Sequence, residues 1–326
     1  MKYQDKIYGE FKITEPVILE LLESAPMQRI KEVNQYGASY YRFSHLDTTR
    51  FEHSVGVYYI LNHLNATLEE QVAGLLHDVP HTAFSHVIDF VFGGESGVPF
   101  HEEFHETIIN NSEIPAILKN HQINSQDIFN HSKYKLLDRD LPDLCADRID
   151  YFFRDMVTDK ALKVAEVEEY FQDMARFEQD IAFEHQAIAK KFAEKFRDAS
   201  DRLWGNPYQA ALYHIFAEAI KIGLIEKVID FKDLFSTDEI VYNKLVESKN
   251  DSIVYRLNQV KDLKIKENPD DYDFFIKAKI RVINPYVLKA GKLIRLSVLD
   301  PEFHRQNQSY YDKKRAGFYI KIINNR

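Results

Sequence analysis

Hydrophobic residues recur at helical spacing through most of the first 250 positions of the chain. Leu68, Val72, Leu75 and Leu76 fall on one face of a helix, since 3.6 residues make one turn. Two further sets with this period are Val167, Tyr170, Met174 and Phe177, and then Ile188, Phe192 and Phe196. The pattern predicts a mainly α-helical body. The first thirteen residues, which end in KIYGEFKI, alternate instead and predict a short β hairpin in front of that body.

The period of the hydrophobic pattern changes after about residue 252. In FFIKAKIRVI (274–283), apolar residues alternate with Lys277, Lys279 and Arg281, which is typical of a strand with one basic face. LIRLSV (293–298) and GFYIKII (317–323) predict further strands. We therefore expect a helical body with its hairpin over residues 1–250 and a small α+β portion over residues 251–326. The basic face is either a solvated edge protected by lysines or a contact for an anion or effector.

Composition and charge exclude several classes of protein. A hydrophobic fraction of 45%, with 23 Phe and 19 Tyr in 326 residues, fits a packed globular chain. The net charge of −9 argues against nucleic-acid binding through a broad basic surface, but not against a phosphorylated small molecule. The single cysteine, Cys145, excludes an internal disulfide. The N-terminus is too polar for a signal peptide, and no apolar run reaches the roughly 18 residues of a membrane span, so we expect a cytoplasmic protein.

Candidate chemistry is concentrated in GLLHDVPHTAFSH (74–86), an otherwise apolar segment with three histidines and one aspartate. His77 and Asp78 follow the buried helical face, and Pro80 stops the helix just beyond them. An imidazole and a carboxylate at one helix end suit a divalent cation, although this pair alone is more often a hydrogen-bonded helix end than a metal site. His53, in TTRFEHSVGVYYI, and Asp147, in CADRIDYFFRD, are the additional candidate ligands.

Four segments, RFEHSVGV, LLHDVPHTAFSH, HEEFHETII and DRIDYFFRD, occur in the order and spacing of a known family. Over about residues 5–160 the chain resembles the HD-domain metal-dependent phosphohydrolases, in particular their deoxynucleoside triphosphate triphosphohydrolase branch. The resemblance implies an HD-domain helical bundle that assembles as a homo-oligomer. It also implies one divalent transition metal, Fe, Mn, Zn or Ni, with Mg²⁺ as a further ion on the substrate phosphates. The implied metal ligands are His53, His77, Asp78 and Asp147.

The resemblance also assigns roles to further residues. His101 matches the catalytic histidine of the family, with His105 as an alternative one helical turn later. His81, His86 and Asp89 would line the reacting phosphate. The positions that contact phosphate are Arg50 and Arg148, and those that hold the 3'-hydroxyl of the sugar are Gln35, Tyr151 and Asp155. Each of these residues could instead have a purely structural role. The histidines could bond the backbone, the arginines could form ordinary ion pairs, and the tyrosine could belong to the core.

These residue types suit phosphate hydrolysis on chemical grounds as well. Attack by water needs a cation that orients the phosphate and a proton carrier for the leaving oxygen. Histidine titrates near neutrality, and arginine offers planar donors to phosphate oxygens. We therefore expect a hydrolase that releases deoxynucleoside and tripolyphosphate from deoxynucleoside triphosphates, with His101 and Asp89 managing the proton. The alternatives are an HD-type nucleotidase or phosphodiesterase acting on another nucleotide, and a nucleotide sensor without hydrolysis.

The sequence departs from the family pattern at two places. Pro80 stands where the family usually has glycine, but either residue would break the helix. The segment before Arg50 lacks the usual PGA motif, so the shape of the sugar or base pocket is not fixed by the resemblance. The identity of the metal, the base preference and the phosphorus atom attacked are likewise left open by the sequence.

Overall fold

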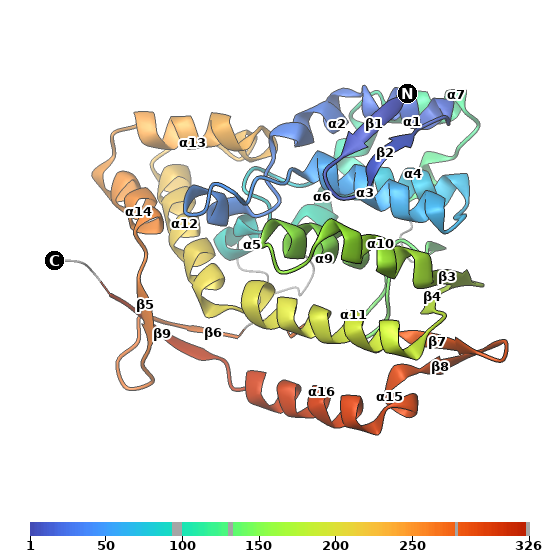
Figure 1. The fold of residues 1–326 in the computed structure, drawn as a ribbon. Helices are drawn as coiled ribbons and strands as arrows, with labels where there is room; N and C mark the ends of the chain where they lie inside the picture. Colours follow the sequence, from blue (N-terminus) through green and yellow to red (C-terminus); the bar gives the residue numbers. More distant parts are fainter. Residues whose placement is uncertain (93–99, 130–132, 278–279, 324–326) are drawn as a thin grey trace.

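The computed structural model of the protein describes residues 1–92, 100–129, 133–277 and 280–323, without the side chains of residues 101 and 102. The mainly α-helical fold predicted from the hydrophobic period is confirmed (Figure 1). The helices of the first half are α1 (Pro16–Leu22), α2 (Ala25–Arg29), α3 (Arg50–His63), α4 (Leu68–Leu76), α5 (Val87–Phe92), α6 (Phe100–Asn110), α7 (Ile114–Asn120), α8 (Ser125–Phe129) and α9 (Ala146–Thr158), with short 3-10 turns η1 (Ile30–Glu32) and η2 (Gly37–Tyr41).

The second half continues the helical body and ends in mixed structure. Its helices are α10 (Val164–Asp173), α11 (Gln186–Ala199), α12 (Pro207–Ile225), α13 (Asp238–Glu247), α14 (Asp251–Lys261), α15 (Leu296–Leu299) and α16 (Pro301–Lys314), with a π-helical turn η4 (Ser200–Trp204) and a 3-10 turn η5 (Asp233–Phe235). Figure 1 shows α3, α9, α11 and α16 stacked one above another. Among the described residues, no helix combines the length and apolar character that a membrane crossing needs.

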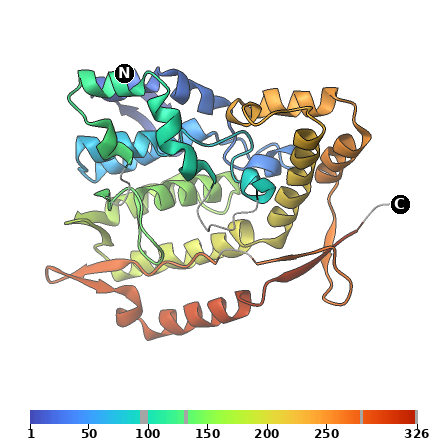
Figure 2. The ribbon, with the colours of Figure 1, turned by 180° about the vertical axis from the view of Figure 1, so that it is seen from behind.

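Three small sheets accompany the helices. The predicted hairpin is confirmed as β1 (Lys2–Asp5) paired with β2 (Gly9–Lys12), and it packs on α3 through the stacked rings of Tyr8 and Tyr59. A four-stranded sheet has the order β3 (Met174–Phe177), β4 (Asp180–Phe183), β7 (Tyr286–Lys289) and β8 (Lys292–Arg295). A three-stranded sheet has the order β5 (Ile265–Glu267), β9 (Phe318–Ile322) and β6 (Phe274–Ile276). Figure 2 shows these two sheets at opposite ends of the molecule.

Three local predictions from the hydrophobic period were wrong. The helix expected through Phe177 ends at Asp173, because the chain turns into the β3–β4 hairpin at Glu178, whose φ is 57°. The strand expected over 274–283 ends at Ile276, and among its described residues Arg281 donates its backbone N–H to Ser200 Oγ instead of to a strand. The strand expected over 293–298 stops at Arg295, where α15 begins.

The buried side chains form two hydrophobic clusters that meet at the segment after α4. The first cluster is built from the N-terminal hairpin and helices α1, α3, α4 and α9 to α11. The second is built from α5 and helices α12 to α14, with β6 and β9. Val79 packs in the first cluster, whereas Phe84 and Val87 pack in the second. The polar residues of the segment 77–86 are therefore held between two packed cores.

Candidate metal centre

The start of α3 fixes two of the predicted site residues. Thr49 caps the helix, because its hydroxyl accepts the backbone N–H of Glu52 at 3.1 Å and the Glu52 carboxylate accepts the N–H of Thr49 at 2.9 Å. Arg50 and His53 then lie in the first turn of α3. One turn later, a Cβ on Gly56 would lie 1.9 Å from Oδ1 of Asp150, so the glycine allows α9 to approach α3 closely.

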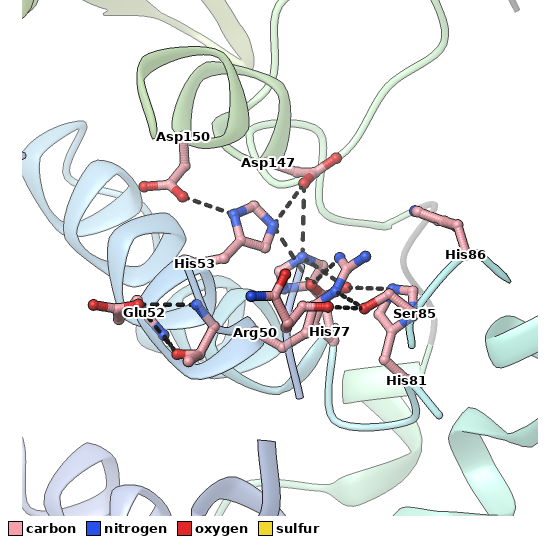
Figure 3. A network of polar contacts seen from close by, with 12 residues as sticks. Arg50, Glu52, His53, His77, His81, Ser85, His86, Asp147 and Asp150 are labelled. Atoms are coloured by element: carbon pink, nitrogen blue, oxygen red, sulfur yellow. Dashed lines mark hydrogen bonds and ion pairs between the residues drawn. The ribbon is translucent and has the colours of Figure 1, made fainter. Parts of the chain in front are cut away.

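The two imidazoles present the same nitrogen to a common centre (Figure 3). His53 directs Nε2 to Oδ1 of Asp147 at 3.0 Å, while its Nδ1 bonds Oδ2 of Asp150 at 2.7 Å. His77 bonds the backbone carbonyl of Gly74 through Nδ1 at 2.7 Å. Its Nε2 lies 3.4 Å from Oδ1 of Asp78 and 3.7 Å from Oδ1 of Asp147. A nitrogen free to coordinate, with the other nitrogen held by an oxygen, is the usual arrangement of metal-binding histidines.

The centre carries an excess of negative charge. Four buried or partly buried carboxylates, those of Asp5, Asp78, Asp147 and Asp150, form a network with His53 and with the two guanidinium groups of Arg50 and Arg154. Burial lowers the pKa of His53, but its hydrogen bonds to Asp147 and Asp150 outweigh that effect and raise the pKa to about 10. The carboxylates around His53 therefore favour a positive charge at this centre.

The residues present fit a divalent transition metal. The donor atoms of His53, His77 and Asp147 lie within 4.8 Å of one another, and Oδ2 of Asp78 is 3.6 Å from Nε2 of His53. The buried Nε2 of His77 makes no hydrogen bond to any described residue, which is costly for a polar atom unless a ligand occupies it. Two imidazole and two carboxylate donors suit iron, manganese, zinc or nickel.

The four remaining predicted histidines have different surroundings. His81 is buried, with Nε2 3.2 Å from Oδ1 of Asp78, and so joins the metal centre. His86 contacts the ring of His81 and bonds Oδ2 of Asp89 through Nδ1 at 3.1 Å. The side chain of His101 lies outside the described residues. His105 is buried with its ring against Phe129, 5.7 Å between centroids.

The two predicted phosphate-binding arginines differ in their partners. Arg50 lies at the centre, where it donates to Oδ2 of Asp78 at 2.7 Å and to Oγ of Ser85 at 3.0 Å. Arg148 is buried and donates instead to the backbone carbonyls of Asp143 and Arg139, at 2.5 and 2.9 Å. These bonds fix the loop before α9. The structure thus brings Arg50 to the metal ligands and gives Arg148 backbone partners.

The residues expected to hold the sugar include two buried acceptors without donors. Oε1 of Gln35 and Oδ1 of Asp155 have no hydrogen-bond partner among the described residues. Burial raises the pKa of Asp155 to about 6, against hydrogen bonding by Trp204. Nε1 of Trp204 donates to Oδ2 of Asp155 at 2.6 Å, and the Trp204 ring packs edge-on against Tyr151, 4.9 Å between centroids. Sequence reasoning missed Trp204, which no motif singles out.

Comparisons with known proteins decide the family. A family model described as HD domain matches residues 50–155. An uncharacterized protein of Bacillus subtilis, YdhJ, is 35% identical over 325 residues, which are 99% of each chain. The chain belongs to the HD-domain phosphohydrolase family. A protein of Cordyceps militaris named metal-dependent phosphohydrolase cns2 is 28% identical over 321 residues, 94% of this chain and 91% of that protein.

Two further proteins resemble the chain in a more limited way, one over part of its sequence and one in fold. The mouse protein named deoxynucleoside triphosphate triphosphohydrolase SAMHD1 is 30% identical over 141 residues, 36% of this chain and 21% of that protein. A solved phosphohydrolase structure from Bacteroides thetaiotaomicron superimposes with a TM-score of 0.77 over 100% of both chains, at 14% identity. At that identity the superposition shows a shared fold alone.

Asp150 is a residue of this HD-domain site that sequence reasoning missed, although it follows Asp147 at helical i,i+3 spacing. Because its carboxylate holds Nδ1 of His53, we expect Asp150→Asn to weaken metal binding about 10- to 100-fold with the ligands intact. Metal affinity can be measured by competition with a chelator. Asp159→Asn, at the far end of α9, is the matched control. Equal affinities in the two variants would contradict this role.

The loop that carries His81 is held from outside the matched HD-domain region. Arg29 donates to the carbonyls of Val79 and His81, at 2.5 and 2.9 Å, and the buried Asp238 accepts the backbone N–H of Phe84 at 2.7 Å. The other oxygen of Asp238 accepts the N–H of Asn34 at 3.0 Å. Phe84 has a φ of 63°, a left-handed conformation that is uncommon outside glycine and needs such support.

Asp238→Ala is therefore expected to destabilise the fold by about 1–3 kcal/mol, since it leaves two buried N–H donors unpaired. Urea unfolding measures this change, and kcat/KM should fall with it as the His81 loop loosens. Glu239→Ala removes an exposed carboxylate at the next position and should change neither. A fully stable and active Asp238→Ala protein would show that the loop keeps its conformation without these two hydrogen bonds.

Proposed function

We propose that the protein hydrolyses deoxynucleoside triphosphates to deoxynucleoside and tripolyphosphate, with a transition metal held by His53, His77, Asp78 and Asp147. The observation that carries the proposal is the pair of imidazoles whose Nε2 atoms face shared carboxylates, while Asp150 and a backbone carbonyl hold Nδ1. The partial similarity to the mouse deoxynucleoside triphosphate triphosphohydrolase supports this choice of substrate.

A bound metal would supply Lewis acidity toward a phosphoryl oxygen and its attacking water. Around it, His81 and His86 offer imidazole donors to the phosphate oxygens, and Asp89 orients His86. The other oxygen of Asp89 accepts the N–H of Phe100 at 2.9 Å, which places the start of α6 beside His86. His101, whose side chain lies outside the described residues, is proposed as the proton carrier on the family resemblance alone. His105, buried against Phe129, is the alternative proton carrier.

The sugar would occupy the space beside Asp155 and Gln35. A hydroxyl group is a hydrogen-bond donor, and these two buried acceptors lack one among the described residues. Leaving them unpaired costs stability that a bound sugar would restore. Trp204 fixes Asp155 in place through its indole N–H, and Tyr151 packs against the same ring. We further propose a homo-oligomer in the cytoplasm, with Mg²⁺ on the substrate phosphates.

The substrate class is tested by nucleoside release from a panel of dNTPs, NTPs and dNMPs, with Mn, Fe(II), Zn or Ni and with Mg²⁺. We expect turnover of dNTPs above the other classes. Turnover of dNMPs instead would move the protein to the nucleotidase class. Tight binding without turnover in any metal would indicate a sensor.

Within the same panel, Asp155→Ala should raise KM for dNTPs about 10-fold, because one hydrogen bond to the sugar is lost. Asp159→Ala, at the C-cap of the same helix, serves as its control. An unchanged KM in Asp155→Ala would place the sugar elsewhere.

A further inference from the structure

The substrate proposed above carries several negative charges, yet most arginines around the site are already committed. Arg50 is paired with Asp78, and Arg154 is paired with Asp5 and Asp150. Arg148 donates to backbone carbonyls. The metal ligands themselves include two carboxylates, which repel a polyphosphate. A polyphosphate bound here would therefore be stabilised by a further cation.

Arg281 reaches this region from the C-terminal part of the chain. Its backbone N–H donates to Oγ of Ser200 at 3.2 Å, which ties it to η4. Its guanidinium carbon lies 5.7 Å from the centroid of the Trp204 ring, the ring that holds Asp155. The guanidinium of Arg281 makes no hydrogen bond or ion pair with any residue in the described part of the chain, and the side chain is only partly buried.

Tyr151 and Tyr213 both lie within electrostatic range of Arg281. Burial raises the pKa of Tyr213 to about 12, and the charges of Arg50 and Arg281 both oppose this shift. Burial likewise raises the pKa of Tyr151 to about 12, against the charges of Arg148 and Arg281. The hydroxyl of Tyr213 donates to the carbonyl of Tyr36, beside Gln35. The Trp204 ring under Arg281 packs on Tyr151 and bonds Asp155, so Arg281 lies beside the proposed sugar site.

We propose that Arg281 is a substrate-binding residue that contacts the polyphosphate chain, supplied by the C-terminal segment outside the matched HD-domain region. The inference rests on the proposed function for the identity of its ligand. A guanidinium offers a planar fork of donors that matches phosphate oxygens, and stacking on Trp204 would hold that fork in orientation. The basic pattern of residues 277–281, which the sequence left between a solvated edge and an anion contact, thus gains a function at Arg281.

The test is titration calorimetry of tripolyphosphate, and separately of deoxyadenosine, into the protein saturated with Mn²⁺. Arg281→Gln should weaken tripolyphosphate binding about 10- to 100-fold and leave deoxyadenosine binding within about twofold, since only the charged ligand loses a charge-assisted hydrogen bond. Arg281→Lys, which keeps the charge without the planar fork, should fall between. Arg305→Gln, an exposed arginine on α16, should bind both ligands like the wild type.

Three results would overturn the inference. The first is unchanged tripolyphosphate binding in Arg281→Gln. The second is an equal loss of both ligands with a lowered melting temperature, which would show a structural role in packing against Trp204. The third is a wild-type protein that binds no tripolyphosphate. If the wild type hydrolyses no dNTP but still binds tripolyphosphate through Arg281, the proposed function fails and the anion site stands.

Discussion

His77→Ala is expected to lose bound metal and to lower kcat on the order of 10³-fold, because the centre loses one of four ligands and with it several kcal/mol of charge stabilisation. Within the described residues His77 makes one hydrogen bond, from Nδ1 to the carbonyl of Gly74, and this bond is the structural contact that the variant loses. Metal content is measured by mass spectrometry of the purified protein, and kcat by nucleoside release.

The matched control for this variant is His304→Ala, which removes an exposed histidine on α16. It should keep both the metal and the activity. His77→Ala should also keep the helical circular dichroism spectrum of the wild type. A His77→Ala protein with full metal content and full activity would contradict the assignment of this ligand.

Arg154→Met is expected to lower the free energy of unfolding by about 3–5 kcal/mol, because it leaves two buried carboxylates without their cation. Arg154 donates to Oδ2 of Asp150 at 2.7 Å and to Oδ2 of Asp5 at 2.9 Å, and its side chain is only 2% exposed. Burial lowers the pKa of Arg154, but the charges of Asp150 and Asp5 outweigh it and raise the pKa well above its ordinary value. Urea unfolding measures the loss.

The same variant should weaken metal binding, since Asp150 orients His53 through the oxygen that Arg154 also holds. Arg305→Met, at an exposed ion pair on α16, should change stability by less than about 1 kcal/mol. If the unpaired carboxylate of Asp5 causes part of the lost stability, adding Asp5→Asn to Arg154→Met should restore that part. A stability change in Arg154→Met as small as in the control would contradict the account of this buried network.

The clustering of the four proposed metal ligands could be predicted from the sequence because each lies at a recognisable local position. His53 follows a capping box, His77 and Asp78 end an amphipathic helix before Pro80, and Asp147 begins another helix. The supports of the site could not be predicted in this way. Asp238 lies more than 150 residues from the loop amides it binds, and no local pattern reports such a contact.

The errors in the fold also have physical causes. Met174 continues a helical period, but the chain instead forms a hairpin that joins β7, a pairing partner more than 100 residues away. After Ile276 the alternation of apolar and basic residues continues, but the described residues 277 and 280–283 form no strand. Val282 and Ile283 are buried there, while Arg281 bonds Ser200 of η4. Short apolar patterns are thus overridden by distant pairing, whereas long helical ones such as α11 are not.

The central claim is that this HD-domain centre cleaves dNTPs between the sugar oxygen and the α-phosphorus. The most direct measurement is ion chromatography of the phosphates released from dGTP by the metal-loaded protein, with the nucleoside quantified in the same sample. Equimolar tripolyphosphate and deoxyguanosine are predicted, and both should be absent in His77→Ala. Orthophosphate or pyrophosphate as the released phosphate product, with a deoxynucleotide left behind, would contradict the account.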